Sequence, residues 1–281
     1  MLGRFVFYPP SPPPSALLIR CRSEMSLIRQ EDAVIYYLHI KYSSLQGASA
    51  SSGRPLTILY SHGNAEDLGS CYETLVVLAR AVGVDIVAYD YCGYGFSRAK
   101  GQSEPTEERV YADADAVFEE LTERLHIEPS RIVLMGRSMG GGPACYLASK
   151  HHSVIGGLIL LSTFTSCLGA VNCSFLRYLC FRDMFPNEKF LQDVGDCPVL
   201  IMHGKNDSVV SFSCAERLLA IVERAQKRLN KGRTVSHYWF KGCNHNDIEL
   251  VCMNLLGRVL NAFLERVTSY NATRHILPLV G

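Results

Sequence analysis

The stretch from Arg131 to Lys150 limits what this chain can fold into more than any other part of the sequence. It reads as a short buried strand, a turn from Gly136 to Gly140, and a helix that opens on glycines. A G-x-S-x-G turn between a strand and a helix is so tight that side chains two positions before and after the serine must be absent. The serine then stands at the N-terminus of a helix, where backbone amides favour negative charge. The pattern predicts that Ser138 is a nucleophile.

Strands and helices alternate along most of the chain, which has 281 residues, 48% of them hydrophobic. The expected strands after the first are residues 56–60, 85–89, 131–135, 158–161, 199–202 and 235–240, and the expected helices are residues 68–82, 105–125, 211–227 and 246–267. Continuous apolar strands between helices are typical of a mostly parallel central sheet with helices on both faces. We therefore expect one α/β domain over residues 31–270.

The ends of the chain differ from this pattern. Residues 1–30 include FVFYPPSPPPS, in which closely spaced prolines exclude a helix. We expect an arm whose aromatic side chains pack on the domain; the alternative is an arm that touches a membrane or a partner. Residues 33–42, AVIYYLHIKY, are rich in β-formers and predict an edge strand. Residues 271–281 are expected to form a C-terminal tail.

Composition excludes several classes of function. The formal net charge is +1, which does not favour nucleic-acid binding. The 11 cysteines include no C-x-x-C pair, and no histidines pair at metal spacing, so we expect free thiols and no metal. The glycines at 140–142 are not followed by Lys and Ser or Thr, so a phosphate loop and a cofactor are not expected. No apolar run is long enough to span a membrane. We expect a cytoplasmic protein and leave peripheral membrane contact open.

Acyl transfer by a serine needs a base that takes the hydroxyl proton and an acid that orients this base. After a G-x-S-x-G turn, the acid (Asp or Glu) and then the histidine base come later in the chain, and each of the three residues follows the end of a strand. Asp207 follows the strand PVLIMHG, and His245 follows HYWFKG. The sequence therefore predicts Ser138, Asp207 and His245 as a catalytic triad. Asp247 and Glu249 are competitors for the acid, but they lie at a helix start, where acids favour the dipole.

The negative oxygen that forms during acyl transfer needs two hydrogen-bond donors. The backbone N–H of Met139 is the expected first donor, because it follows the nucleophile. The second comes from the early loop after the strand LTILY, where we favour the amide of Asn64 over that of Ala65. His62 in this loop is expected to be structural.

Two further segments lie where they could shape the site. The turn DYCGYGFS, residues 90–97, is expected to form the floor of the active-site rim, with substrate contact through Tyr91 or Tyr94 as the alternative. Residues 162–190 form a short cap-like insertion that is too small for a full lid. Its apolar part between Phe175 and Phe185 either packs over the sheet edge or lines a groove for an acyl chain.

Six motifs together resemble the α/β-hydrolase domain-containing 17 family, lidless serine hydrolases related to the Bem46-like proteins. They are SHGNAEDLG, DYCGYGFS, GRSMGGGP, FPNEKF, HGKNDSVVSFS and GCNHNDIEL, and the resemblance runs from about Phe5 to Leu250. It implies an α/β-hydrolase fold without a large lid and removal of S-linked palmitoyl groups from membrane-attached proteins. Ser138, Asp207 and His245 match the family's triad. Arg137 and Gly141-Gly142 stand where the family has other residues, and Cys21 is the only early cysteine where the family carries a cysteine-rich stretch.

Several functions remain open at this stage. The first is a thioesterase that acts on S-acylated proteins, with lipid-like esters as alternative substrates. A carboxylesterase or monoacylglycerol lipase and a serine peptidase would use the same fold and triad. A catalytically inactive binding module is the alternative from another class. The sequence does not determine the acyl length, the protein substrate or the oligomeric state.

Overall fold

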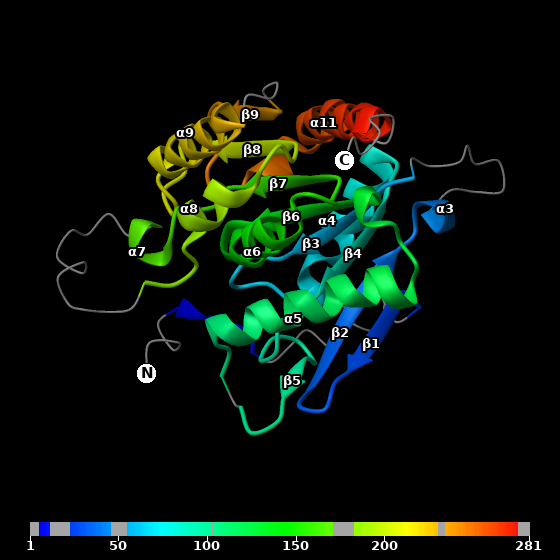
Figure 1. The fold of residues 1–281 in the computed structure, drawn as a ribbon. Helices are drawn as coiled ribbons and strands as arrows, with labels where there is room; N and C mark the ends of the chain where they lie inside the picture. Colours follow the sequence, from blue (N-terminus) through cyan, green and yellow to red (C-terminus); the bar gives the residue numbers. More distant parts are fainter. Residues whose placement is uncertain are drawn as a thin grey trace.

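A computed structural model describes residues 6–11, 23–45, 55–102, 104–170, 183–229 and 234–274. Its centre is one mixed sheet in the order β1-β2-β4-β3-β6-β7-β8-β9, with β5 paired to β2 (Figure 1). Strands β1 and β2 run antiparallel to their neighbours, and the pairs from β4 to β9 are parallel. The strands are β1 Met25–Arg29, β2 Ala33–Ile40, β3 Thr57–Ser61, β4 Asp85–Tyr89, β5 Arg98–Ala99, β6 Ile132–Arg137, β7 Gly157–Leu161, β8 Val199–Gly204 and β9 Val235–Phe240.

Helices cover both faces of this sheet. They are α3 Tyr42–Leu45, α4 Leu68–Val82, α5 Glu107–Glu119, α6 Gly141–His151, α7 Cys167–Ala170, α8 Asn187–Phe190, α9 Phe212–Arg228, α10 Ile248–Val251 and α11 Met253–Arg274. Buried side chains of α5, α6 and α9 join one hydrophobic cluster, and those of α4 and α11 join a second cluster on the other face. The architecture is an α/β-hydrolase fold, as the sequence predicts.

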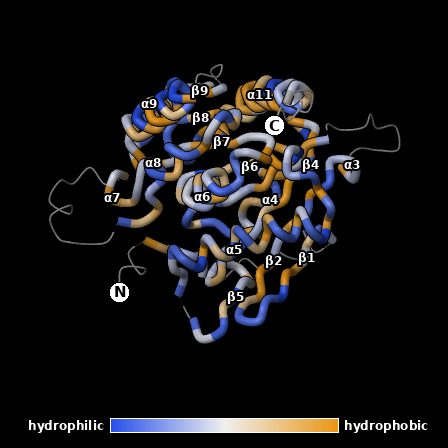
Figure 2. The backbone as a smooth tube through the Cα atoms, viewed as in Figure 1, coloured by the Kyte–Doolittle hydropathy of each residue, from blue (hydrophilic) through white to orange (hydrophobic). Residues whose placement is uncertain are grey.

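Local chemistry accounts for these elements. The strands β3, β6, β7 and β8 are buried along their whole length, as expected for strands covered on both faces. Helix α4 begins at a capping box of Asp67 and Ser70 and ends at Gly83, whose φ of 67° is left-handed. Helix α9 alternates hydrophilic and hydrophobic residues along its length, as expected for a helix with one buried side (Figure 2).

The structure differs from the sequence-based expectations at several boundaries. Strand β1 lies inside the segment expected to be an arm and pairs with β2, so the edge of the sheet is β1 and not residues 33–42. The helix expected over 105–125 ends as α5 at Glu119 and continues as a π-helical turn, Glu120–Arg124. The helix expected over 246–267 is two helices, α10 and α11, and α11 extends into the expected tail.

The parallel strands place the chemistry at one edge of the sheet. The segments after the carboxyl ends of β3, β6, β8 and β9 carry the residues at 63–65, 138–140, 205–210 and 243–247. Because parallel strands end at the same side, these four segments gather there. Within the residue ranges that the structure describes, the cysteines are free thiols.

Candidate active site

Ser138 lies at the turn between β6 and α6 and is partly exposed. Its φ of 51° is unusual for a residue with a side chain. A Cβ at Gly136 would lie 2.4 Å from the carbonyl oxygen of Gly140, and a Cβ at Gly140 would lie 2.0 Å from that of Ser61. Both glycines are therefore required by close backbone contacts, which is the physical reason for the G-x-S-x-G spacing.

Three side chains from three different strand ends form one hydrogen-bonded chain. His245 Nε2 lies 3.0 Å from Ser138 Oγ, and His245 Nδ1 lies 2.8 Å from Asp207 Oδ2. If Nδ1 carries the proton and donates it to Asp207, Nε2 is left to accept the hydrogen of the serine hydroxyl. The structure thus brings together the three residues that the sequence selects.

Asp207 is held by more partners than the sequence analysis anticipated. Its Oδ1 accepts hydrogen bonds from the backbone amides of Val209 and Val210, at 2.9 and 2.7 Å. Its Oδ2 lies 3.1 Å from Nε2 of His203, in addition to the contact with His245. Burial raises the pKa of Asp207, but the hydrogen bonds from His203, His245 and Val210 outweigh it and hold this pKa well below its usual range.

Sequence reasoning missed the role of His203. Its side chain is buried, and its Nε2 also lies 2.9 Å from the carbonyl oxygen of Val210. The spacing of His203 and Asp207, four residues apart at a strand end, is the signal that could have found it.

The two competing acids are engaged elsewhere. Asp247 Oδ2 accepts the backbone amide of Asn244 at 3.0 Å, and Glu249 Oε1 accepts Nε of Arg137 at 2.6 Å. Because His245 already has Asp207 at 2.8 Å, this geometry favours Asp207 over both of them as its partner.

The loop expected to supply a hydrogen-bond donor also anchors the N-terminal arm. Asn64 Nδ2 donates to the carbonyl oxygen of Val6 at 2.6 Å, and Asn64 Oδ1 accepts the amide of Tyr8 at 2.9 Å. The carboxamide of Asn64 is thus used by the arm, and the candidate donor is its backbone N–H. Met139, the other candidate donor, is buried directly after Ser138, at the start of the turn that leads into α6.

Buried aromatic residues support this loop from the turn after β4. Tyr91 donates to the carbonyl oxygen of His62 at 2.8 Å, and Tyr94 donates to Asn64 Oδ1 at 2.7 Å. Both rings are fully buried and pack on the His62 ring, with centroids 4.3 and 5.4 Å away. His62 Nδ1 lies 2.7 Å from the carbonyl oxygen of Gly63, which agrees with a structural histidine. Full burial rules out the alternative that Tyr91 or Tyr94 contacts substrate in this structure.

The cap-like insertion is described at its two ends. Phe185 is fully buried; its amide donates to Glu107 Oε1 at 2.7 Å, and its ring packs at 5.9 Å from that of Phe7 in the arm. Met184 packs on the core while partly exposed. Phe185 therefore has the packing role and does not line a groove. The other apolar residues of the expected groove, Phe175, Leu176, Tyr178, Leu179 and Phe181, lie outside the described residues.

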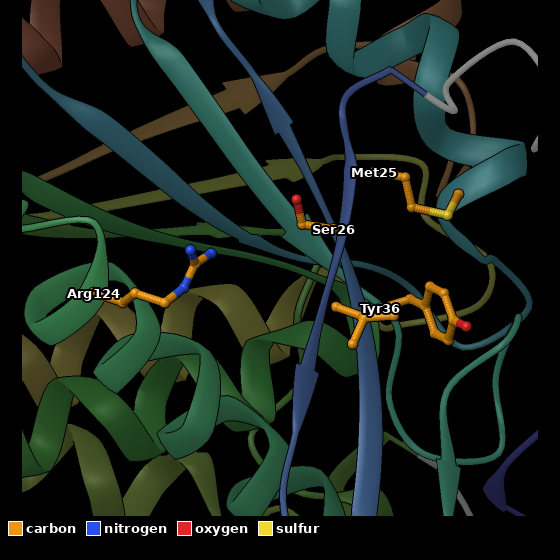
Figure 3. Close-up of a pocket in the computed structure, with 5 residues that line it drawn as sticks. Met25, Ser26, Tyr36 and Arg124 are labelled. Atoms are coloured by element: carbon orange, nitrogen blue, oxygen red, sulfur yellow. The ribbon is translucent and has the colours of Figure 1, made fainter.

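A separate hollow of about 650 Å³ lies beside β1 and β2 (Figure 3). Met25, Ser26, Leu27, Tyr36 and Arg124 line it. It follows the edge strand β1, which is separated from β6 by three strands, so it is not part of the site around Ser138.

Within the described ranges, no three His, Cys, Asp or Glu side chains form a group that could hold a metal. None of the helices in those ranges is long and apolar enough to cross a membrane.

Comparisons with known proteins agree with the fold. A family model for the alpha/beta hydrolase fold matches residues 57–179. The chain is 38% identical over 194 residues to human alpha/beta hydrolase domain-containing protein 17B, a match that covers 69% of this chain and 62% of the relative. It is 37% identical over 205 residues to protein 17C of Xenopus tropicalis, with 73% and 61% covered. The chain thus spans about three fifths of the length of the relatives it matches.

Solved structures share the fold at low sequence identity. A Pyrococcus furiosus esterase, Pf2001, superposes with a TM-score of 0.65 at 15% identity, covering 92% of this chain and 97% of that one. Mouse alpha/beta hydrolase domain-containing protein 10 gives 0.59 at 16% identity, covering 86% and 99%.

Proposed function

We propose that this chain, which has the α/β-hydrolase fold and is similar in sequence to the domain-containing 17 proteins, is a serine hydrolase that works through an acyl-enzyme. The observation that carries the proposal is the hydrogen-bonded chain from Ser138 through His245 to Asp207, which ends on a partly exposed hydroxyl. The left-handed φ of Ser138 supports it further, since strained backbone of this kind gathers at functional sites.

In the proposed reaction, His245 Nε2 takes the proton from Ser138 Oγ as this oxygen attacks the carbonyl carbon of the substrate. Asp207 keeps the proton of the neutral imidazole on Nδ1 and stabilises the imidazolium that forms. The carbonyl oxygen becomes negative and accepts hydrogen bonds from the backbone amides of Met139 and Asn64. The protonated His245 then gives its proton to the leaving group, which departs as a thiol or an alcohol and leaves the acyl group on Ser138.

Water completes the proposed cycle. His245 takes a proton from a water molecule, whose oxygen attacks the carbonyl carbon of the acyl-enzyme. As the tetrahedral intermediate collapses, the bond to Ser138 Oγ breaks, His245 returns the proton to this oxygen, and the free acid is released. Each step uses groups of this chain and water.

We propose S-acylated proteins as the substrates and thioester hydrolysis as the reaction. The support is the motif-by-motif resemblance to the domain-containing 17 family together with the identity to its curated members. A carboxylesterase or monoacylglycerol lipase is the second candidate, because the same hydrogen-bonded chain of Ser138, His245 and Asp207 can attack an oxygen ester. Peripheral contact with membranes belongs to this proposal, because S-acylated proteins reside there.

A fluorophosphonate probe tests the nucleophile. It should label the wild-type chain covalently and should leave Ser138→Ala unlabelled, because the probe reacts with an activated serine hydroxyl. Equal labelling of the two proteins, measured by intact mass, would place the reactive serine elsewhere.

A substrate panel tests the reaction class. Thioesters and oxygen esters with the same acyl group, at several chain lengths, should be hydrolysed in proportions that favour the long-chain thioesters. Ser138→Ala measures the background rate of each substrate. A preference for oxygen esters at every length would replace the thioesterase with the carboxylesterase or lipase.

A further inference from the structure

Arg137, the residue between Gly136 and the proposed nucleophile, is buried with three polar partners. Its Nε lies 2.6 Å from Glu249 Oε1, its Nη2 lies 2.9 Å from Asn246 Oδ1, and its Nη1 lies 3.3 Å from Glu66 Oε1. Burial lowers the pKa of Arg137, but Glu66 and Glu249 outweigh it, and the pKa stays above its usual value. The guanidinium thus remains charged, and each of its three nitrogens contacts a different side chain.

One of these contacts reaches the loop after β3. Glu66 accepts Arg137 with Oε1 and the backbone amide of Gly63 with Oε2, the latter at 2.7 Å. A Cβ at Gly63 would lie 2.7 Å from Arg137 Nη1 and 2.9 Å from Glu66 Oε2. The ion pair therefore lies directly against the backbone that leads into Asn64 and holds the first peptide of the loop in place.

The other two contacts reach the segment that carries His245. Asn246 is the next residue, and Glu249 lies in the first turn of α10. On the opposite flank, Asn244 Oδ1 accepts the amide of Ser208 at 2.9 Å, next to Asp207. His245 is thus fixed on one side to the segment of the acid and on the other side to Arg137, whose neighbour is Ser138.

We propose that Arg137 is a positioning residue, which keeps the imidazole of His245 and the backbone of residues 63–64 in register with Ser138. This inference rests on the serine hydrolase proposed above. A residue in this role links the nucleophile, the base and the loop after β3 that carries the candidate donor Asn64. These three segments follow different strands and are far apart in sequence. A displacement of about 1 Å in such a geometry can lower the rate by about 100-fold.

The first experiment replaces the guanidinium. Arg137→Gln should lower kcat and the rate of fluorophosphonate labelling by about 100-fold, with KM nearly unchanged, because the substrate itself does not touch this side chain. Arg137→Lys keeps the charge but not the fork, and it should recover only part of the loss.

Arg109→Gln is the matched control. Arg109 is equally buried and also bridges several partners, with Nε 2.7 Å from Asp113 Oδ1, Nη1 2.9 Å from Asp32 Oδ2 and Nη2 3.0 Å from Gln30 Oε1. It lies on α5, and none of these three partners belongs to the segments that carry Ser138 and His245. Its loss should lower the thermal midpoint to a similar extent and leave kcat of the folded protein near that of the wild type.

A second experiment avoids leaving two partly buried carboxylates without a cation, since this can destabilise the fold. Glu66→Gln and Glu249→Gln each remove one contact of the network while Arg137 keeps its other partners. If both act through Arg137, their effects on log kcat are not additive, and the double variant loses less than the sum of the single losses.

The outcomes separate this inference from the proposed function. If the wild type shows no activity that depends on Ser138, the proposed function fails. If the wild type is active but folded Arg137→Gln has the wild-type kcat, the positioning role alone is wrong. Strict additivity of the Glu66 and Glu249 variants would also overturn it, because the two carboxylates would then act independently.

Discussion

At the scale of single residues, Asp207 shows how a chain can keep a carboxylate ionised next to its base. Four donors converge on its two oxygens, and two of them are the histidines His203 and His245. Hydrogen bonds of this kind favour the charged form more than burial disfavours it. The consequence is an acid that stays negative whether or not His245 is protonated during turnover.

This arrangement predicts the outcome of two amide substitutions. Asp207→Asn should lower kcat by up to about four orders of magnitude, because an amide no longer enforces the tautomer of His245. Asp247→Asn should keep turnover near normal, since Asp247 accepts the amide of Asn244 and not the base. Steady-state kinetics with one ester substrate compares the two, and the reverse order of effects would assign the acid to Asp247.

The lowered pKa of Asp207 also predicts how stability depends on pH. Because its folded pKa lies below its unfolded value of about 3.9, the folded state binds fewer protons in that range. The contribution to stability is complete above about pH 4 and is lost as the pH falls toward the folded pKa.

Chemical denaturation at several pH values tests this point. Between about pH 4 and pH 2, the wild type should lose stability more steeply than Asp207→Asn, by at most about 1.4 kcal/mol per pH unit. His245→Asn is the control that keeps Asp207 but removes one of its donors, and its slope should lie between those two. Parallel curves for all three proteins would contradict the assigned shift.

At the scale of elements, the turn from β6 into α6 depends on how closely backbone can approach its neighbours. Beyond the glycines of the turn, a Cβ at Gly141 would lie 1.9 Å from Thr163 Oγ1, and a Cβ at Gly142 would lie 2.3 Å from the Phe185 ring. Thr163 Oγ1 also donates to the carbonyl oxygen of Ser138 at 2.6 Å. The glycines that resemble a phosphate loop in the sequence are therefore packing glycines.

Gly142→Ala tests this packing. Alanine favours a helix over glycine by about 1 kcal/mol, but overpacking a filled core costs about 1–3 kcal/mol, so we expect net destabilisation. Gly257→Ala in α11 is the control, because its nearest neighbour, the Cβ of Ala81, would lie 3.2 Å away, a much milder overlap than the 2.3 Å at Gly142. Thermal denaturation should show a lower midpoint for Gly142→Ala than for Gly257→Ala, and equal midpoints would contradict the close contact.

At the scale of the whole molecule, segments far apart in sequence meet beside the proposed nucleophile. Phe185 joins the arm through Phe7, the helix α6 through Gly142, and α5 through Glu107. Figure 1 shows the described part of the arm on the same side of the molecule as α7 and α8. The arm and the end of the insertion thus pack against each other through Phe7 and Phe185, and Met184, next to Phe185, is a partly exposed apolar side chain.

If a long acyl chain contacts Met184, then Met184→Ser should reduce turnover of long-chain substrates more than that of short-chain substrates. Each methylene that loses apolar contact is worth about 0.8 kcal/mol, or roughly a fourfold change in the long-to-short ratio. Leu229→Ser, which removes an exposed apolar side chain at the end of α9, is the control and should leave the ratio unchanged. If folded Met184→Ser has the wild-type ratio of long-chain to short-chain turnover, this end of the insertion has only a packing role.

The sequence by itself determines the class of fold and the residues of the candidate site. The G-x-S-x-G turn, the alternating strands and helices, and the polar residues after β8 and β9 follow local rules of sterics and periodicity. Such rules can be read from neighbouring residues. For the same reason Ser138, Asp207 and His245 are found by their positions after strands, before any contact between them is known.

Only the tertiary structure decides which side chains meet. Strand β1 pairs with β2 inside a segment that reads as an arm, because pairing depends on the partner strand and not on local propensity alone. The second histidine on Asp207, the arm on Asn64 and the three partners of Arg137 all involve groups brought together by the sheet and its loops. A polar side chain at a strand end has many possible partners in sequence. The register of the parallel strands selects among them, since it sets which loops lie within hydrogen-bond distance.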